Sequence, residues 1–151
     1  MTSATIPSLC CGTALRKASR RVTQLYDEAL APIGLRSTQY SILVELGRRS
    51  REAPSLQTLA DALVMDRSAL GHTLRPLERD GLLEMQQGED DRRQRRVVLT
   101  AQGQAVLASA RPLWLKAQDR FCKVLGEQDA ALLRATLLGI AADERLGSLA
   151  A

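Results

Sequence analysis

Apolar residues recur every three to four positions through most of the chain, which is the spacing of one face of an α-helix. Residues 9–30 show this spacing and stop just before a proline and a glycine, so we expect a first helix there. A second helix is predicted over residues 38–49, with Ser37 as its N-cap residue. A polar stretch that contains a proline then predicts a loop.

Two shorter helices are expected next, separated by a tight turn at residues 64–65. Ser55 is predicted to cap a helix that reaches residue 63, and Asp66 to cap a helix that reaches residue 80. Gly81 stands where a glycine commonly ends a helix. The second helix has an apolar stripe at helical spacing, made of Leu70, Leu74 and Leu77. Two helices joined in this way predict a helix-turn-helix.

The pattern changes after this point. Residues 82–87 and 95–99 are short runs on either side of a charged tip at residues 88–94, so we expect an antiparallel hairpin. A long helix is predicted from the cap residue Thr100 to about residue 125, and a last one over residues 127–146. The apolar side of these two helices is expected to include Val124, Leu132, Leu133, Leu137 and Ile140. The fold class predicted is mainly α with a small β-hairpin.

Composition narrows the function. The net charge of +4 and the pI near 9.3 are compatible with nucleic acid, whereas 3% aromatic residues argue against single-strand or RNA binding, which depends on stacking. The longest apolar runs are too short to cross a membrane, and residues 1–9 lack the pattern of a secretory signal. Three cysteines in such a chain suggest a reducing compartment, so we expect a cytoplasmic protein.

No chemistry typical of an enzyme is visible in the sequence. The single histidine, His72, has no partners at zinc-ligand spacing, and neither a Ser–His–Asp arrangement nor a phosphate-binding loop is present. The sequence therefore predicts no catalytic residue, no metal and no cofactor.

Duplex DNA is the partner that the helix-turn-helix favours, because a major groove accepts one α-helix. The polar side of the helix over residues 66–80 presents short groups and arginines, and the hairpin has four arginines in five positions. Arginine is attracted to the negative potential of a narrow minor groove. The candidate DNA contacts are Arg67, Ser68, His72, Thr73, Arg75, Arg92, Arg93 and Arg95.

These residues resemble the MarR family of bacterial regulators. The resemblance is carried by Asp66-Arg67-Ser68, by the sequence Leu-Glu-Arg-Asp-Gly-Leu over residues 77–82, by Asp91-Arg92-Arg93 and by Leu-Thr-Ala-Gln-Gly over residues 99–103. It implies a homodimer on a pseudo-palindromic operator, in which residues 8–33 and 101–148 form a helical dimerisation arm. It also implies a winged helix-turn-helix lobe over residues 37–100. Within this lobe Asp91 is expected to form a salt bridge, and Arg93 to enter the minor groove.

The signal that releases such a regulator from DNA stays open at this stage. Cys10 and Cys11 open the first helix, where the helix dipole lowers a thiol pKa, and they resemble the peroxide-sensing branch of the family. The spacing to the tyrosines departs from that branch by one or two residues, and Ser37 stands where the branch has a second tyrosine. A small aromatic effector is the alternative, in a pocket lined by Tyr26, Tyr40 and Trp114, and a constitutive repressor is a third.

Two other function classes compete with a DNA-binding regulator. One is a thiol-dependent peroxide-reducing enzyme that uses Cys10 or Cys11, although no convincing resolving cysteine is present. The other is a helical protein-interaction module with no role on DNA, which the arginine-rich hairpin argues against.

Overall fold

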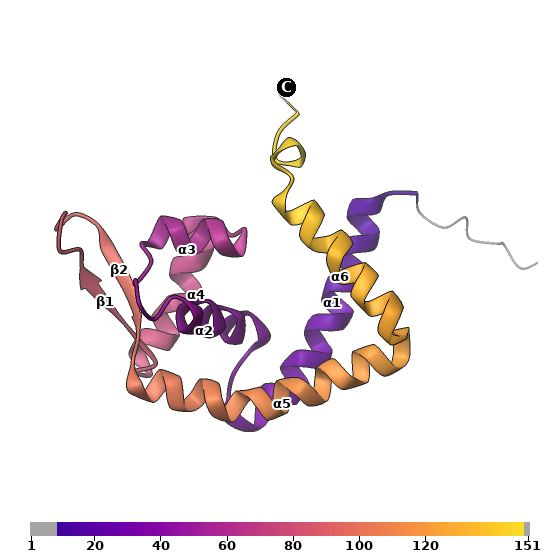
Figure 1. Ribbon diagram of the computed structural model, residues 1–151, viewed down its shortest axis with the longest axis horizontal. Helices are drawn as coiled ribbons and strands as arrows, with labels where there is room; N and C mark the ends of the chain where they lie inside the picture. The colour runs from indigo at the N-terminus through magenta and orange to yellow at the C-terminus, as the bar shows by residue number, and fades with distance from the viewer. Residues whose placement is uncertain (1–8, 150–151) are drawn as a thin grey trace, which may run out of the picture.

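The computed structural model describes residues 9–149 and confirms a mainly α fold with one small hairpin (Figure 1). Two predictions concern residues that lie partly outside this range: the dimerisation arm, which begins at residue 8, and the missing secretory signal, which concerns residues 1–9. The elements, in chain order, are α1 (Cys11–Leu30), a 3-10 turn η1 (Ala31–Ile33), α2 (Ser37–Arg48), α3 (Leu56–Leu63), α4 (Arg67–Arg79), β1 (Leu83–Gln87), β2 (Arg95–Leu99), α5 (Ala101–Leu125), α6 (Glu127–Ala142) and η2 (Glu144–Leu146).

The long helix α5 joins two parts of the molecule. In Figure 1 it runs along the bottom, with α2, α3, α4 and the hairpin gathered at one end and with α1 and α6 at the other. The buried core lies in the first part, where Ile42, Leu59 and Leu70 are fully buried. None of the helices within residues 9–149 is long and apolar enough to span a membrane.

Local side-chain caps start three helices, as the sequence predicted. The backbone N–H of Thr58 donates to Ser55 Oγ at 3.1 Å, and that of Ala69 donates to Asp66 Oδ1 at 2.9 Å. Thr100 Oγ1 accepts from Gly103 N–H at 3.0 Å. Each cap satisfies a backbone donor that the first helical turn leaves unpaired.

The predicted cap of α2 is wrong. Ser37 is the first residue of the helix, and its N–H donates to Asp27 Oδ1 of α1 at 2.7 Å. Partial burial raises the pKa of Asp27, but the hydrogen bonds from Ser37 and the nearby Arg36 guanidinium outweigh it and hold that pKa below its usual value. A carboxylate ten residues away replaces the local cap because α1 packs against the start of α2.

The turn between α3 and α4 depends on a left-handed residue. Val64 has a φ of 51° and the N–H of Met65 returns to the carbonyl of Ala60 at 2.9 Å, which closes the end of α3. A β-branched side chain rarely adopts this conformation, and the Val64 side chain is 70% exposed. The predicted turn is confirmed, with backbone strain at its first residue.

The two strands pair antiparallel, with Leu83 opposite Leu99 and Gln87 opposite Arg95. The loop before α3 adds to this sheet, because Val97 N–H donates to the Pro54 carbonyl at 2.9 Å. The hairpin is thereby tied to the helix-turn-helix at its base, while its tip projects away (Figure 1).

The C-terminal part departs from the expectation in two respects. The last α-helix ends at Ala142, because Asp143 is extended and only the short turn η2 follows. Several apolar side chains expected to lie inside are exposed in the single chain, with Val124 at 74% and Leu132 at 68% exposure. Helical spacing identifies the apolar side of a helix, but it does not say whether another part of the same chain covers it.

Candidate nucleic-acid interface

Helix α4 divides into a buried and an exposed side. Leu70, Leu74 and Leu77 are buried in the core, as predicted. The opposite side is open to solvent and presents Arg67, Ser68, His72 and Arg75. Thr73 lies at the border, half-buried, with its hydroxyl donating to the carbonyl of Ala69 at 3.0 Å. The helix continues through Pro76 to Arg79, so the exposed side is one continuous surface.

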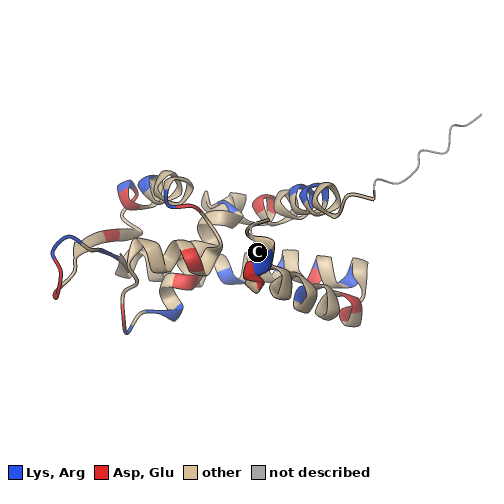
Figure 2. Cartoon of the chain, turned by 90° about the horizontal axis from the view of Figure 1, so that it is seen from above, with Lys and Arg blue, Asp and Glu red and all other residues tan. Residues whose placement is uncertain are grey.

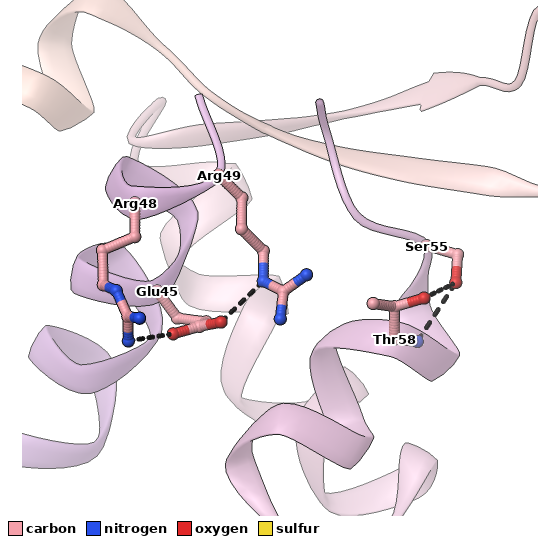
Figure 3. A network of polar contacts seen from close by, with 5 residues as sticks. All are labelled: Glu45, Arg48, Arg49, Ser55 and Thr58. Atoms are coloured by element: carbon pink, nitrogen blue, oxygen red, sulfur yellow. Dashed lines mark hydrogen bonds and ion pairs between the residues drawn. The ribbon is translucent and has the colours of Figure 1, made fainter. Parts of the chain in front are cut away.

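Helix α3 supports α4 from behind through buried Leu59 and Ala60. Figure 3 shows polar contacts at the start of α3 and at the end of α2. The hydroxyl groups of Ser55 and Thr58 form a hydrogen bond across the first turn of α3 at 2.9 Å. In the same view Arg49 and Arg48 approach the Glu45 carboxylate from two sides, at 2.6 and 3.4 Å. These contacts lie at the two ends of the loop that joins α2 to α3.

The arginines of the hairpin have two different environments. Arg92, Arg93 and Arg95 are exposed, and in Figure 2 the basic and acidic residues alternate along the backbone of the hairpin tip. Arg96 is half-buried and donates to the carbonyl of Ala53 at 2.9 Å, so it holds the base of the hairpin. Three of the four arginines therefore remain available to an external partner.

The salt bridge expected for Asp91 is not formed. Within residues 9–149 its carboxylate has no ion pair, and Oδ1 instead accepts from the backbone N–H of Arg93 at 2.9 Å. This bond closes the turn at the tip, together with one from Gln94 N–H to the Asp91 carbonyl at 3.0 Å. The Asp91 carboxylate therefore stabilises the turn that contains Arg93 and forms no salt bridge within the lobe.

Two basic pockets separate α4 from the hairpin. A pocket of about 540 Å³ lies between Arg67, the start of α3, and Arg93 and Arg95 of the hairpin. Another of about 350 Å³ lies between Glu78 and the same two arginines, with Arg92 beside them. The structure thus brings Arg67 and Glu78 of α4 and the exposed arginines of the hairpin around two neighbouring pockets, which together we call the basic trough.

The three aromatic residues predicted to line an effector pocket do lie together. The rings of Tyr40 and Trp114 are stacked at 6.0 Å, and those of Tyr26 and Trp114 lie 6.3 Å apart. They border a small pocket of about 230 Å³ between α1, α2 and α5. Burial raises the pKa of Tyr26, with a smaller contribution from Cys122, while Tyr26 donates to Gln118 Oε1 at 2.6 Å.

A larger pocket, of about 580 Å³, lies between α2 and α5 and shares only Tyr40 with the smaller one. Its lining includes Val44, Leu107 and two arginines, Arg48 and Arg111. Burial raises the pKa of Tyr40, and the positive charge of Arg111 opposes that rise. Sequence reasoning missed both arginines, because nothing local distinguishes them from other exposed basic residues.

The two N-terminal cysteines are exposed at the start of α1. Cys10 is the N-cap residue, and hydrogen bonds from Thr13, including its N–H to Sγ at 3.4 Å, hold its thiol pKa below the usual value. Fifteen helical residues separate Cys11 from Tyr26, which is about 22 Å along the axis. Cys10 and Cys11 are therefore not in contact with Tyr26 of the same chain. The third cysteine, Cys122 of α5, is buried.

Within residues 9–149, no three histidine, cysteine, aspartate or glutamate side chains lie close enough together to hold a metal ion.

The sequence profile of the MarR family matches residues 35–94, which span the helix-turn-helix and most of the hairpin. Among solved structures, the M. tuberculosis transcriptional regulator MosR in complex with DNA is 32% identical, with a TM-score of 0.78, over 87% of this chain and 93% of that chain. The transcriptional repressor CouR bound to a 23-mer DNA duplex is 30% identical, with a TM-score of 0.79, over 87% of this chain and 92% of that one. CouR from Rhodococcus jostii RHA1 bound to p-coumaroyl-CoA aligns at 24% identity and a TM-score of 0.77, over 92% and 96% of the two chains. With this identity along nearly the whole length of the relatives, the chain belongs to the MarR family of transcriptional regulators.

Proposed function

We propose that the protein is a transcriptional repressor that binds duplex DNA as a homodimer and is released by a small effector. The observation that carries this function is the single face on which the exposed side of α4 and three exposed hairpin arginines lie together. Such a face matches a duplex, since a helix fits the major groove and arginine fits the adjacent minor groove. The protein then acts in the cytoplasm, where bacterial DNA lies.

The DNA contacts divide by position on this face. Ser68, His72 and Arg75 lie on the exposed side of α4 and are proposed to read base edges, with Thr73 at the border of that surface. Arg67 and Arg95, beside the basic trough, are proposed to bind phosphates, together with Arg92. The turn closed by Asp91 presents Arg93 to the minor groove.

The proposed homodimer is supported by the apolar side that α5 and α6 leave uncovered. Leu132, Leu138 and Val124 are each more than 60% exposed, which is uncommon for side chains of this size on a monomer. We assign residues 8–33 and 101–148 to the dimerisation arm and residues 37–100 to the DNA-binding lobe. A second copy on the arm places two lobes on one pseudo-palindromic operator.

For the effector we propose a small aromatic molecule that carries an acidic group. The pocket between α2 and α5 combines the ring of Tyr40 with the guanidinium groups of Arg48 and Arg111. Glu45 fixes Arg48 at 3.4 Å, and arginine binds carboxylates in a forked geometry. Trp114 stacks on Tyr40 and is itself in contact with Tyr26, and both are proposed to support this pocket.

Binding of the wild-type protein to duplex fragments from upstream of its own and neighbouring genes tests the function. Affinity is expected to fall steeply with salt, with a slope of about −0.9 per phosphate contact, because bound phosphates release counterions. The Arg93→Ala variant should bind all duplexes more weakly, and His72→Ala should change the preferred sequence. Arg120→Ala, an exposed arginine of α5 away from the proposed face, is the matched control.

Absent or salt-insensitive binding by the wild-type protein refutes the proposed function. Equal affinity of the Arg93→Ala and Arg120→Ala variants refutes the docking of the hairpin. The peroxide-reducing alternative predicts consumption of hydroperoxide that is lost in Cys10→Ser and Cys11→Ser variants, whereas a repressor acts by binding alone.

A further inference from the structure

Gly71 lies on the flank of α4 that faces the hairpin. It follows Arg67 by four residues and precedes Glu78 by seven, so the three positions form one stripe along the helix. Arg67 lines one of the two pockets shared with the hairpin, and Glu78 lines the other. Gly71 therefore lies between the two pockets of the basic trough, at a position where α4 has no side chain.

The fold gives no reason for a glycine at this position. A glycine inside a helix costs about 1 kcal/mol of stability relative to alanine. A Cβ built on Gly71 would meet no atom within 4 Å. The backbone at Gly71 also lacks the positive φ that favours glycine. Gly103 of α5 is the opposite case, since a Cβ there would lie 1.9 Å from the carbonyl oxygen of Leu82.

We propose that Gly71 is a DNA-contact position whose missing side chain lets one sugar–phosphate strand lie against α4. This inference rests on the proposed function. When a helix occupies a major groove and a hairpin occupies the adjacent minor groove, the strand that separates the grooves passes between them. In this protein that path is the trough, where Arg67, Arg93 and Arg95 supply positive charge. A side chain at residue 71 displaces the strand from those arginines.

The test compares Gly71→Ala with Gly139→Ala, a control in α6 where a Cβ also meets nothing of its own chain within 4 Å. Because residue 139 lies in the proposed arm, both variants are first shown by light scattering to keep the wild-type oligomeric mass. Both variants should unfold at a higher temperature than the wild type, by about 2–4 °C per kcal/mol gained in a chain of this size. Only Gly71→Ala should lose DNA affinity, by about tenfold, which corresponds to about 1.4 kcal/mol. Because phosphates carry no sequence information, the loss should be equal on the operator and on an unrelated duplex.

Three results overturn the inference. Wild-type affinity of the Gly71→Ala variant for both duplexes shows that the strand does not approach residue 71. A loss confined to the operator assigns residue 71 to a base edge instead of a phosphate. Failure of the wild-type protein itself to bind either duplex refutes the proposed function as well, and this outcome is visible without any variant.

Discussion

The joint between the hairpin and α5 depends on Gly103, and we predict that Gly103→Ala strongly destabilises the lobe. Gly103 is buried in the first turn of α5, directly against the chain that enters β1. An added Cβ would lie 1.9 Å from Leu82 O and 2.7 Å from Leu99 Cδ1. The first of these is a backbone atom, so a change of side-chain rotamer cannot relieve the overlap.

The size of the destabilisation follows from the contacts that are lost when α5 moves away from residues 81–82. Leu82 O accepts from Thr100 N–H at 3.1 Å, and Thr100 Oγ1 donates to the Gly81 carbonyl at 2.6 Å. Moving α5 away loses these two bonds, at about 1 kcal/mol each, and loosens the buried packing of Leu99, at about 1–3 kcal/mol. The higher helix propensity of alanine stabilises the folded state by about 1 kcal/mol and offsets part of this loss. The expected net destabilisation is about 2–4 kcal/mol.

Urea unfolding followed by circular dichroism measures this difference directly. The Gly139→Ala variant serves as the control, because the same substitution in open space should stabilise its helix by up to about 1 kcal/mol. A Gly103→Ala protein as stable as the wild type contradicts the close packing of α5 on the hairpin. A loss of stability of similar size in both variants contradicts the assignment to this contact.

Three other variants test separate features. Asp27→Asn should lower stability by about 1–2 kcal/mol at pH 7, because Ser37 N–H loses a charged acceptor. Folding lowers the Asp27 pKa, so the contribution of its carboxylate to stability is present above the unfolded value of about 4 and is lost as the pH falls through the lower folded value. The urea midpoints of variant and wild type should therefore converge as the pH falls through that lower value. Val64→Gly should raise the melting temperature, by relieving about 1 kcal/mol of left-handed strain, and a lower temperature contradicts this. Under hydroperoxide, DNA release by the wild type but not by a protein with Cys10→Ser and Cys11→Ser supports a thiol sensor, and equal release removes that role.

Features encoded by neighbouring residues were predictable from the sequence. The caps at Ser55, Asp66 and Thr100 each bond to a backbone N–H three residues ahead, so the residue type and its position suffice. The two sides of α4 follow from helical spacing alone. The hairpin is a similar case, because its strands are separated only by the charged tip.

Features that depend on packing between distant segments were not predictable. The α2 cap comes from Asp27, which a local rule cannot select over Ser37. The Asp91 carboxylate accepts from the backbone N–H of Arg93 in its own turn, although its sequence position among arginines is equally compatible with an ion pair. Arg48 and Arg111 are 63 positions apart and meet at one pocket only because α2 lies on α5. Each of these results depends on tertiary contacts that the order of residues does not state.

The same packing indicates how an effector would act in the proposed function. Helix α5 is continuous through residues 101–125, with α2, α3, α4 and the hairpin at its start and with α1 and α6 at its end. The pocket that contains Arg48 and Arg111 opens between α2 of the lobe and α5, so a ligand there competes with the packing that sets the angle of the lobe. It can shift the lobes only by the difference in its affinity for the two arrangements, typically about 1–3 kcal/mol. Because both lobes must fit one operator, a small change of angle at each is enough to weaken binding.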